Sequence, residues 1–407
     1  MTRTLKPLLI AAFALSAANA AAQKFEGLAQ TPPMGWSSWN KFGCEINEDI
    51  IKQTADLMVS TGLRDAGYIY LNIDDCWQGE RDSLGFIQLD SVTFPSGMKP
   101  VGDYIHERGL KFGIYSDAGR ATCAKRVSSL GHEYQDAMSY ASWGVDFLKY
   151  DWCFAENINP MGAYMLMRDA LYAAGRPIVF SMCEWGSNRP WEWAQNIGHM
   201  WRTTGDIENC FDCTDDHGGT WTSLGVMPIV YQNLPLRQYS GPGHWNDPDM
   251  MQVGNGMPVN EERAHFSMWC MLAAPLILGN DLSNMNEGTL SVILNTEAIA
   301  VDQDPLGVQG LRHSDVDGIQ FWFKPLLNDE WALCILNSTT EERQIVLDWQ
   351  EFNFTDDLSD MSTGFDSTVY KVRDLWAHRN DGNTRKSRKL TMPGHDVVMY
   401  RLTPSGK

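Results

Sequence analysis

Acidic side chains recur along this chain at the ends of short apolar segments. One of eight such segments, MGWSSWN, ends near Trp39. The other seven end on carboxylates, which are Asp74 with Asp75, Asp117, Asp151, Glu184, Asp206, Asp249 and Asp281. Paired carboxylates act as acids, bases and nucleophiles, and glycoside hydrolysis uses two of them. No metal-ligand spacing accompanies these acids, so carboxylate chemistry on a sugar is the first candidate.

Two of the segments predict specific roles. In FLKYD, Lys149 and Asp151 are two residues apart, so on a strand they share a face. A neighbouring lysine favours the ionised carboxylate that a nucleophile requires. In WRTTGD, Asp206 follows a Thr-Thr-Gly turn, where a partly buried carboxylate with a raised pKa would suit a general acid. Structural ion pairs, Lys149 with Asp151 and Arg202 with Asp206, are the alternatives.

Adjacent acids and tryptophans at other segment ends suggest sugar contacts. Asp74 and Asp75 repel each other unless ligand hydroxyls or positive groups share them. Four tryptophans lie in or beside predicted strand ends: Trp36, Trp77, Trp185 and Trp245. Each ring could stack on a sugar or pack in the core, and the sequence favours neither.

The segments between the apolar runs have helical periodicity. The clearest cover residues 47–62, 134–144, 160–175 and 260–273, the last with a predicted Asn260 cap. Eight alternations of strand and helix predict a (β/α)₈ barrel, whose chemistry lies at the C-terminal ends of its strands. No glycine-rich nucleotide fingerprint follows the first strand.

The pattern changes after residue 310. Five strand-like segments follow, GIQFWFKPL, EWALCILNST, RQIVLDW, STVYKVRDLW and HDVVMYRLT, with polar turns between them. This predicts an antiparallel β-sandwich. The expected organisation is a signal peptide at 1–22, a catalytic barrel at 23–308 and a sandwich at 309–407.

The N-terminus and the charge indicate an exported protein with a neutral partner. The start, MTRTLKPLLIAAFALSAANA, is typical of a secretory signal peptide cut near Ala20 or Ala22, which predicts export to the periplasm or the medium. The net charge of −19 argues against nucleic acid or anionic membranes as partners. No later segment predicts a membrane helix, and the sequence fixes no oligomeric state.

Nine cysteines in an exported chain predict disulfides with at least one thiol left unpaired. Cys210 and Cys213 form a CxxC without a second CxxC or a histidine cluster nearby. A local disulfide is therefore favoured over a zinc site or a redox motif.

Several motifs in order resemble glycoside hydrolase family 27, the melibiase-type α-galactosidases. They are TPPMGWSSWN, AGYIYLNIDDCW, GLKFGIYSD, WGVDFLKYDWC, SMCEWG, WRTTGDI, GPGHWNDPDM, AAPLILGNDL and VDQDPLG. The resemblance implies a retaining barrel enzyme with a C-terminal β-sandwich, an α-galactoside substrate and no cofactor. In retaining enzymes the two carboxyl groups lie about 5–5.5 Å apart.

The resemblance also assigns residues. It implies Asp151 as the nucleophile and Asp206 as the acid/base. The implied sugar contacts are Trp36, Asp74, Asp75, Lys149, Cys183, Trp185, Arg202 and Met250. The implied disulfides are Cys44–Cys76 and Cys123–Cys153.

Within that family, Asp74 at the position of the exocyclic CH₂OH favours galactose over L-arabinopyranose. Bulky Glu184 and Trp185 disfavour N-acetylgalactosaminides. Two features depart from common family patterns: Trp152 and the segment ENCFDCTDDHGG after Asp206. The family resemblance therefore predicts the reaction but not the preference for the aglycone. The alternatives are a β-L-arabinopyranosidase and a non-catalytic carbohydrate-binding barrel.

Overall fold

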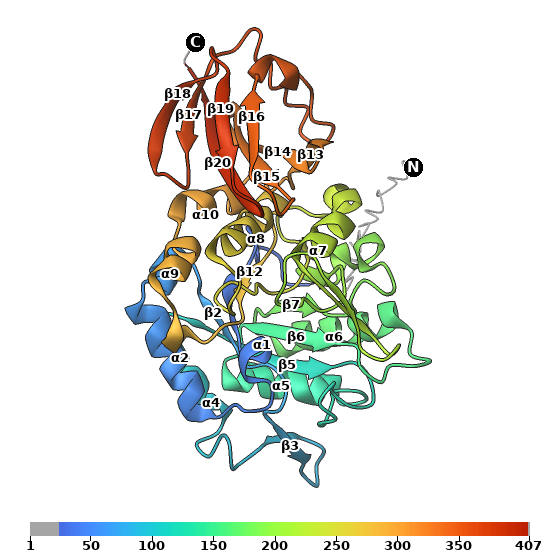
Figure 1. Cartoon of the computed structure of the whole chain (residues 1–407). Helices are drawn as coiled ribbons and strands as arrows, with labels where there is room; N and C mark the ends of the chain where they lie inside the picture. The colour runs from blue at the N-terminus through green and yellow to red at the C-terminus, as the bar shows by residue number, and fades with distance from the viewer. Residues whose placement is uncertain (1–23, 406–407) are drawn as a thin grey trace, which may run out of the picture.

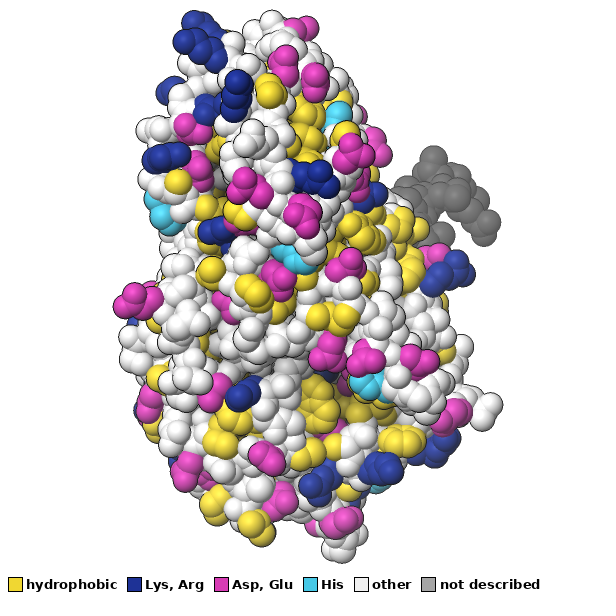
Figure 2. Space-filling model, viewed as in Figure 1, with side chains coloured by type: hydrophobic (Ala, Val, Ile, Leu, Met, Phe, Trp, Pro, Cys, Tyr) yellow, Lys and Arg dark blue, Asp and Glu magenta, His cyan; other side chains and the backbone are white. Residues whose placement is uncertain are grey.

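The computed structural model describes residues 24–405, which form a barrel domain and a β-sheet domain stacked on one side of it (Figure 1). The predicted signal peptide, residues 1–22, lies outside the described residues. Within residues 24–405, no helix has both the length and the apolar character needed to cross a membrane. Acidic side chains are spread over both domains on the face in Figure 2, with Lys and Arg between them.

Eight parallel strands form the barrel, in agreement with the predicted fold class. In sheet order they are β12 (Leu276–Leu278), β1 (Met34–Ser37), β2 (Tyr70–Asn72), β5 (Lys111–Asp117), β6 (Phe147–Asp151), β7 (Val179–Met182), β8 (Met200–Arg202) and β11 (Trp245–Asp247). A parallel bridge between Met251 and Leu278 joins the segment after β11 to β12. The amide of Met251 donates to the Ile277 carbonyl at 2.7 Å, and this contact closes the ring.

Helices follow the strands and cover the barrel. They are α1 (Trp39–Phe42), α2 (Glu48–Ser60), α3 (Leu63–Ala66), α4 (Met98–Glu107), α5 (Glu133–Trp143), α6 (Pro160–Ala174), α7 (Val226–Asn233), α8 (Val259–Leu272), α9 (Glu287–Ile293) and α10 (Thr296–Asp302). The described residues also contain six 3₁₀ helices. Four lie in the barrel domain, η1 (Pro190–Glu192), η2 (Ala194–Asn196), η3 (Leu234–Tyr239) and η4 (Leu282–Asn284), and two lie in the second domain, η5 (Leu327–Asp329) and η6 (Trp349–Phe352). Two hairpins extend from the barrel, β3 (Gln78–Arg81) with β4 (Ile87–Leu89), and β9 (Thr214–Asp216) with β10 (Thr222–Leu224).

The predicted cap of the helix at 260–273 is wrong. Pro258 occupies the N-cap position of α8, and Asn260 lies inside the first turn. The side-chain amide of Asn260 donates instead to the Gly394 carbonyl of the second domain at 2.8 Å. Packing between the domains therefore determines the role of this side chain, and no local capping bond forms.

Most barrel strands are shorter than the apolar segments predicted. Only β5 and β6 end on their predicted acids, whereas β2, β7, β8, β11 and β12 stop before theirs. Beyond those points the backbone amides bond within the loops: Cys76 donates to the Asp75 side chain and Ile207 to the Asp249 side chain. Asp117 and Asp151 therefore lie at strand ends, and the other acids lie on loops at the C-terminal end of the barrel.

The second domain is antiparallel, as predicted. One sheet has the order β13 (Leu311–Val316), β14 (Ile319–Leu326), β15 (Glu330–Asn337), β20 (Asp396–Pro404), β17 (Tyr370–Asp374) and β18 (Arg379–Asn383). A second, two-stranded sheet pairs β16 (Arg343–Leu347) with β19 (Arg388–Met392). Side chains of both sheets share one core, including Phe323, Trp331, Leu347 and Met392. The sequence did not predict β13, β18 and β19, and β18 (RNDGN) contains no apolar residue that could reveal it.

Polar side chains buried between the domains tie the sandwich to α8. The ammonium of Lys324 on β14 is buried and donates to the Cys270 carbonyl at 2.8 Å. Arg263 on α8 forms an ion pair with Asp396 on β20, and Trp376 donates to Ser267 at 3.0 Å. A buried ammonium without such a partner would be costly, so these contacts fix how the domains meet.

Candidate active site

A cavity opens at the C-terminal end of the barrel, and all eight strands or the loops after them contribute to it. Its lining residues are Ser37, Asn72, Ile73, Asp74, Ile114, Phe147, Lys149, Ser181, Cys183, Met200, Arg202, Asp247, Asp249, Met250 and Ile277. Five of the predicted sugar contacts are among them: Asp74, Lys149, Cys183, Arg202 and Met250. Every lining residue belongs to the barrel, so the sandwich supplies no side chain to this cavity.

Asp151 is the last residue of β6 and is buried. Phe147 and Lys149, at alternate positions on the same strand, line the cavity, so Asp151 continues the inward-facing side. Burial raises the pKa of Asp151 to about 6, and the positive charge of Lys149 opposes this rise. One carboxylate oxygen accepts the Trp152 amide at 2.9 Å, which fixes the orientation of the group.

Lys149 forms its ion pair with a residue other than Asp151. Its ammonium contacts Asp74 at 3.0 Å, and Asp74 also accepts the Ser37 hydroxyl at 3.2 Å. The simple structural pair considered for the K-x-D pattern is therefore wrong, because the loop after β2 brings Asp74 to the lysine. The charge of Lys149 still acts on Asp151 from within the cavity.

Asp206 lies in the loop after β8, and its side chain is 46% exposed. Arg202 contacts Asp206 and Asp249, both at 3.0 Å, so the predicted pair exists but the arginine is shared. Asp249 also accepts the amides of Ile207 and Met250 and has a left-handed φ of 101°. A non-glycine residue in this conformation is strained, which the several contacts of its side chain counteract.

Asp249 is a site residue that the sequence reasoning missed. Its segment was identified as a strand end carrying a carboxylate, but no role was assigned to the residue. Burial raises the pKa of Asp249 to about 7, while the Arg202 charge opposes the rise. The strand-end position was the available signal; the pairing with Arg202 depends on contact between two loops.

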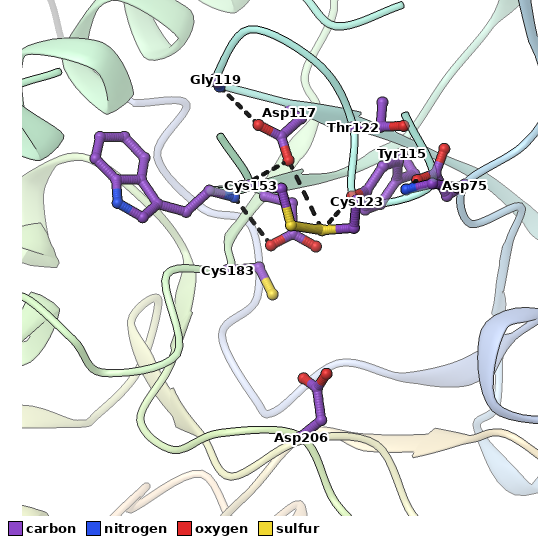
Figure 3. The surroundings of a disulfide bond; sticks show 12 residues. Asp75, Tyr115, Asp117, Gly119, Thr122, Cys123, Cys153, Cys183 and Asp206 are labelled. Atoms are coloured by element: carbon purple, nitrogen blue, oxygen red, sulfur yellow. Dashed lines mark hydrogen bonds between the residues drawn. A yellow bond between two sulfur atoms is a disulfide. The ribbon is translucent and has the colours of Figure 1, made fainter. Parts of the chain in front are cut away.

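A second carboxylate lies directly beside Asp151. Asp117 on β5 is the register partner of Asp151, and oxygens of both groups lie within 4.8 Å of each other and of the Cys123 and Cys153 sulfurs. Figure 3 shows this cluster, in which Asp117 accepts the amides of Gly119 at 2.6 Å and Cys153 at 2.9 Å. Burial and the Asp151 charge raise the pKa of Asp117 to about 9. The two buried carboxyl groups therefore disfavour a second negative charge at this position.

Both disulfides implied by the resemblance are present, and Cys210–Cys213 forms the local disulfide that the CxxC spacing favoured. Cys123–Cys153 joins the loop after β5 to the loop after β6, two residues beyond Asp151. Because its sulfurs are oxidised, they supply no thiolate for a metal beside Asp117 and Asp151. Cys183, Cys270 and Cys334 are buried free thiols, as the odd cysteine count required.

Three other predicted contacts lie outside the cavity lining. Asp75 is buried and accepts the amides of Cys76 and Ala124. Trp36 is 0% exposed and donates to the Asn280 carbonyl at 2.8 Å, so a sugar reaches its ring only if covering side chains move. Trp185 follows β7, is half-buried and has a φ of 58°. Their contact with a sugar stays a prediction.

The remaining aromatic and acidic candidates pack in the core or make local structural contacts. Trp77 and Trp245 are fully buried, so for these rings the core alternative is correct. Asp281 caps η4 by accepting the Ser283 amide. Trp152, which departs from the family pattern, stacks on Tyr164 of α6 with ring centroids 5.5 Å apart.

Two family models match the chain. Residues 31–304 match the one described as alpha galactosidase A, and residues 316–402 match the alpha galactosidase C-terminal beta sandwich domain. The chain belongs to the α-galactosidase family. The α-galactosidase A of Cellvibrio japonicus is 52% identical over 390 residues, which cover 96% of each chain.

Solved structures of α-galactosidases agree with the fold. The Saccharomyces cerevisiae α-galactosidase with raffinose has a TM-score of 0.86 at 31% identity, covering 93% of this chain and 99% of that one. A β-L-arabinopyranosidase from Geobacillus stearothermophilus has a TM-score of 0.77 at 23% identity, covering 93% and 98%. That identity supports a common fold alone, so the arabinopyranosidase alternative gains no support beyond it.

Proposed function

We propose that this α-galactosidase releases terminal α-D-galactosyl groups with retention, using Asp151 as nucleophile and Asp206 as acid/base. The observation that carries the proposal is a buried carboxylate, Asp151, at the end of β6 on the strand face that lines the cavity, with a more exposed carboxylate, Asp206, in the loop after β8. In Figure 3 the Asp206 carboxylate is directed toward Cys183 and the Cys123–Cys153 disulfide. The charge of Asp206 raises the pKa of Asp151, so the two carboxylates are close enough to interact.

In the first step an Asp151 oxygen forms a bond to C1 of galactose. The bond from C1 to the leaving oxygen breaks, and that oxygen takes the proton of Asp206. In the second step water attacks C1, its proton returns to Asp206, and the ester bond to Asp151 breaks.

The other lining residues support recognition of a neutral hexose. Asp74 is held between Lys149 and Ser37, so its oxygens are fixed where the proposal places the exocyclic CH₂OH. The Glu184 carboxyl is buried, and burial raises its pKa to about 7. Together, the Glu184 and Trp185 side chains leave little room for an N-acetyl group on the sugar. Raffinose-type oligosaccharides are the substrate class proposed.

We further infer that the protein is exported. The basic and apolar start of the chain supports this, as do the three disulfides within residues 24–405.

A kinetic and stereochemical test addresses the proposed reaction. We expect the 4-nitrophenyl α-galactoside to be hydrolysed at least about 100-fold faster than the β-L-arabinopyranoside, because loss of the CH₂OH contact leaves buried polar groups unpaired. Proton NMR should detect α-galactose as the first product. First appearance of the β anomer would contradict double displacement, and equal arabinoside cleavage would contradict the substrate assignment.

Replacing Lys149 with Met should move the acid limb of the pH profile upward. The Lys149 charge lowers the pKa of Asp151, so removing it raises that pKa and leaves less anionic nucleophile at low pH. The kcat/KM of the variant should therefore fall at a higher pH than that of the wild type, whose limb we expect near pH 6. The Lys149→Arg variant keeps the charge and should keep the limb. If the acid limb of the Lys149→Met variant stayed at the wild-type pH, the Lys149 charge would not control the ionisation of Asp151.

A further inference from the structure

The segment after Asp206 forms a hairpin attached directly to the proposed acid/base. The Leu224 amide donates to the Asp206 carbonyl at 2.9 Å, and Leu224 also bridges Ile207. From this root β9 and β10 extend as an antiparallel pair (yellow-green, below α7 in Figure 1). The Cys210–Cys213 disulfide closes the loop between the root and β9.

The tip of this hairpin presents two stacked aromatic rings. His217 and Trp221 have ring centroids 3.7 Å apart at an angle of 10°. Trp221 is 50% exposed, and it is the one tryptophan of residues 24–405 that is exposed. His217 Nε2 lies 2.9 Å from the Ser223 hydroxyl, and its amide donates to the Trp221 carbonyl at 3.0 Å. The rings are therefore held in place by the hairpin before any ligand arrives.

We propose that Trp221, backed by His217, is a binding platform for the aglycone sugar of the substrate. The inference rests on the proposed function, because Asp206 protonates the leaving oxygen and the aglycone must therefore lie on the Asp206 side. Trp221 is three residues from Leu224, so its backbone lies about 10 Å along the hairpin from the Asp206 backbone. That separation suits a sugar unit beyond the cleaved bond, and the apolar face of a pyranose packs on an indole.

The charge around the platform selects among sugars. Asp212, Asp215 and Asp216 are exposed on the same hairpin. Their negative charges repel an anionic aglycone, so the platform fits neutral sugars and disfavours uronic acids. The inferred ligand is therefore a neutral oligosaccharide that carries galactose at its non-reducing end.

The test compares substrates with and without a sugar aglycone. We expect Trp221→Ala to lower kcat/KM for raffinose and for galactosyl-manno-oligosaccharides about tenfold, the loss of one stacking contact. Hydrolysis of α-galactosyl fluoride, which has no aglycone sugar, should stay within about twofold of wild type. Trp221→Phe should restore most of the loss, and His217→Ala should show a smaller loss with the same substrate pattern. The control is Tyr134→Ala on α5, since Tyr134 is 49% exposed and should affect neither substrate.

Two outcomes would overturn the platform. An equal loss on the fluoride and the oligosaccharides would mean that the hairpin only supports Asp206. Unchanged oligosaccharide kinetics would mean that the rings contact no aglycone. Failure of the proposed function can be told apart from these two outcomes, because the wild-type protein would then not hydrolyse α-galactosyl fluoride.

Discussion

Replacing Asp151 with Asn lowers kcat/KM for an aryl α-galactoside by about 10⁴-fold or more, because covalent catalysis cannot proceed without its nucleophile. The amide has nearly the same shape, and its oxygen still accepts the Trp152 amide that Asp151 accepts at 2.9 Å. The fold should therefore persist, which a thermal unfolding curve checks. Single-turnover kinetics should show that the galactosyl-enzyme no longer forms.

The matched control is Asp117→Asn on the neighbouring strand. Asp117 is the register partner of Asp151, but both of its oxygens accept backbone amides, those of Gly119 and Cys153. Its replacement should cost far less activity, because these oxygens hold the backbone and form no bond to the sugar. A fluorinated galactosyl fluoride should label the peptide that contains Asp151. Label on another peptide, or comparable losses in both variants, would assign the nucleophile elsewhere.

Replacing Asp206 with Asn should produce a loss that depends on the leaving group. General acid catalysis contributes about 10²–10⁴-fold, and a poor leaving group needs the proton most. We expect raffinose hydrolysis to fall by about that factor, while galactosyl fluoride should react nearly as fast as with the wild type in the first step.

Asp281→Asn provides the comparison for Asp206. Asp281 is another loop carboxylate after a barrel strand, but it caps η4 by accepting the Ser283 amide. Its replacement should leave the dependence on the leaving group unchanged. An Asp206→Asn enzyme that loses the same factor on every substrate would have lost a structural contact, such as the one with Arg202, and no proton donor.

The barrel was predictable because its pattern is local and repeated eight times. Alternation within FLKYD identified Lys149 and Asp151 as neighbours on one face of a strand; Lys149 lines the barrel cavity, and Asp151 is buried at the end of the same strand. The strand ends were less predictable, since β8 stops at Arg202 and leaves Asp206 in a loop. Strand β18 was not predictable at all, because RNDGN has no apolar alternation and its pairing with β17 alone makes it a strand.

The amino-acid sequence by itself determined the two domains, the faces of the strands and the pair of acids, since periodicity sets which side chains share a face. Only the tertiary structure decided that Lys149 pairs with Asp74, that Asp117 lies beside Asp151, and that Arg202 is shared by Asp206 and Asp249. The physical reason is that these contacts cross between strands and loops far apart in the chain. Their geometry depends on register and closure of the barrel, which no local pattern encodes.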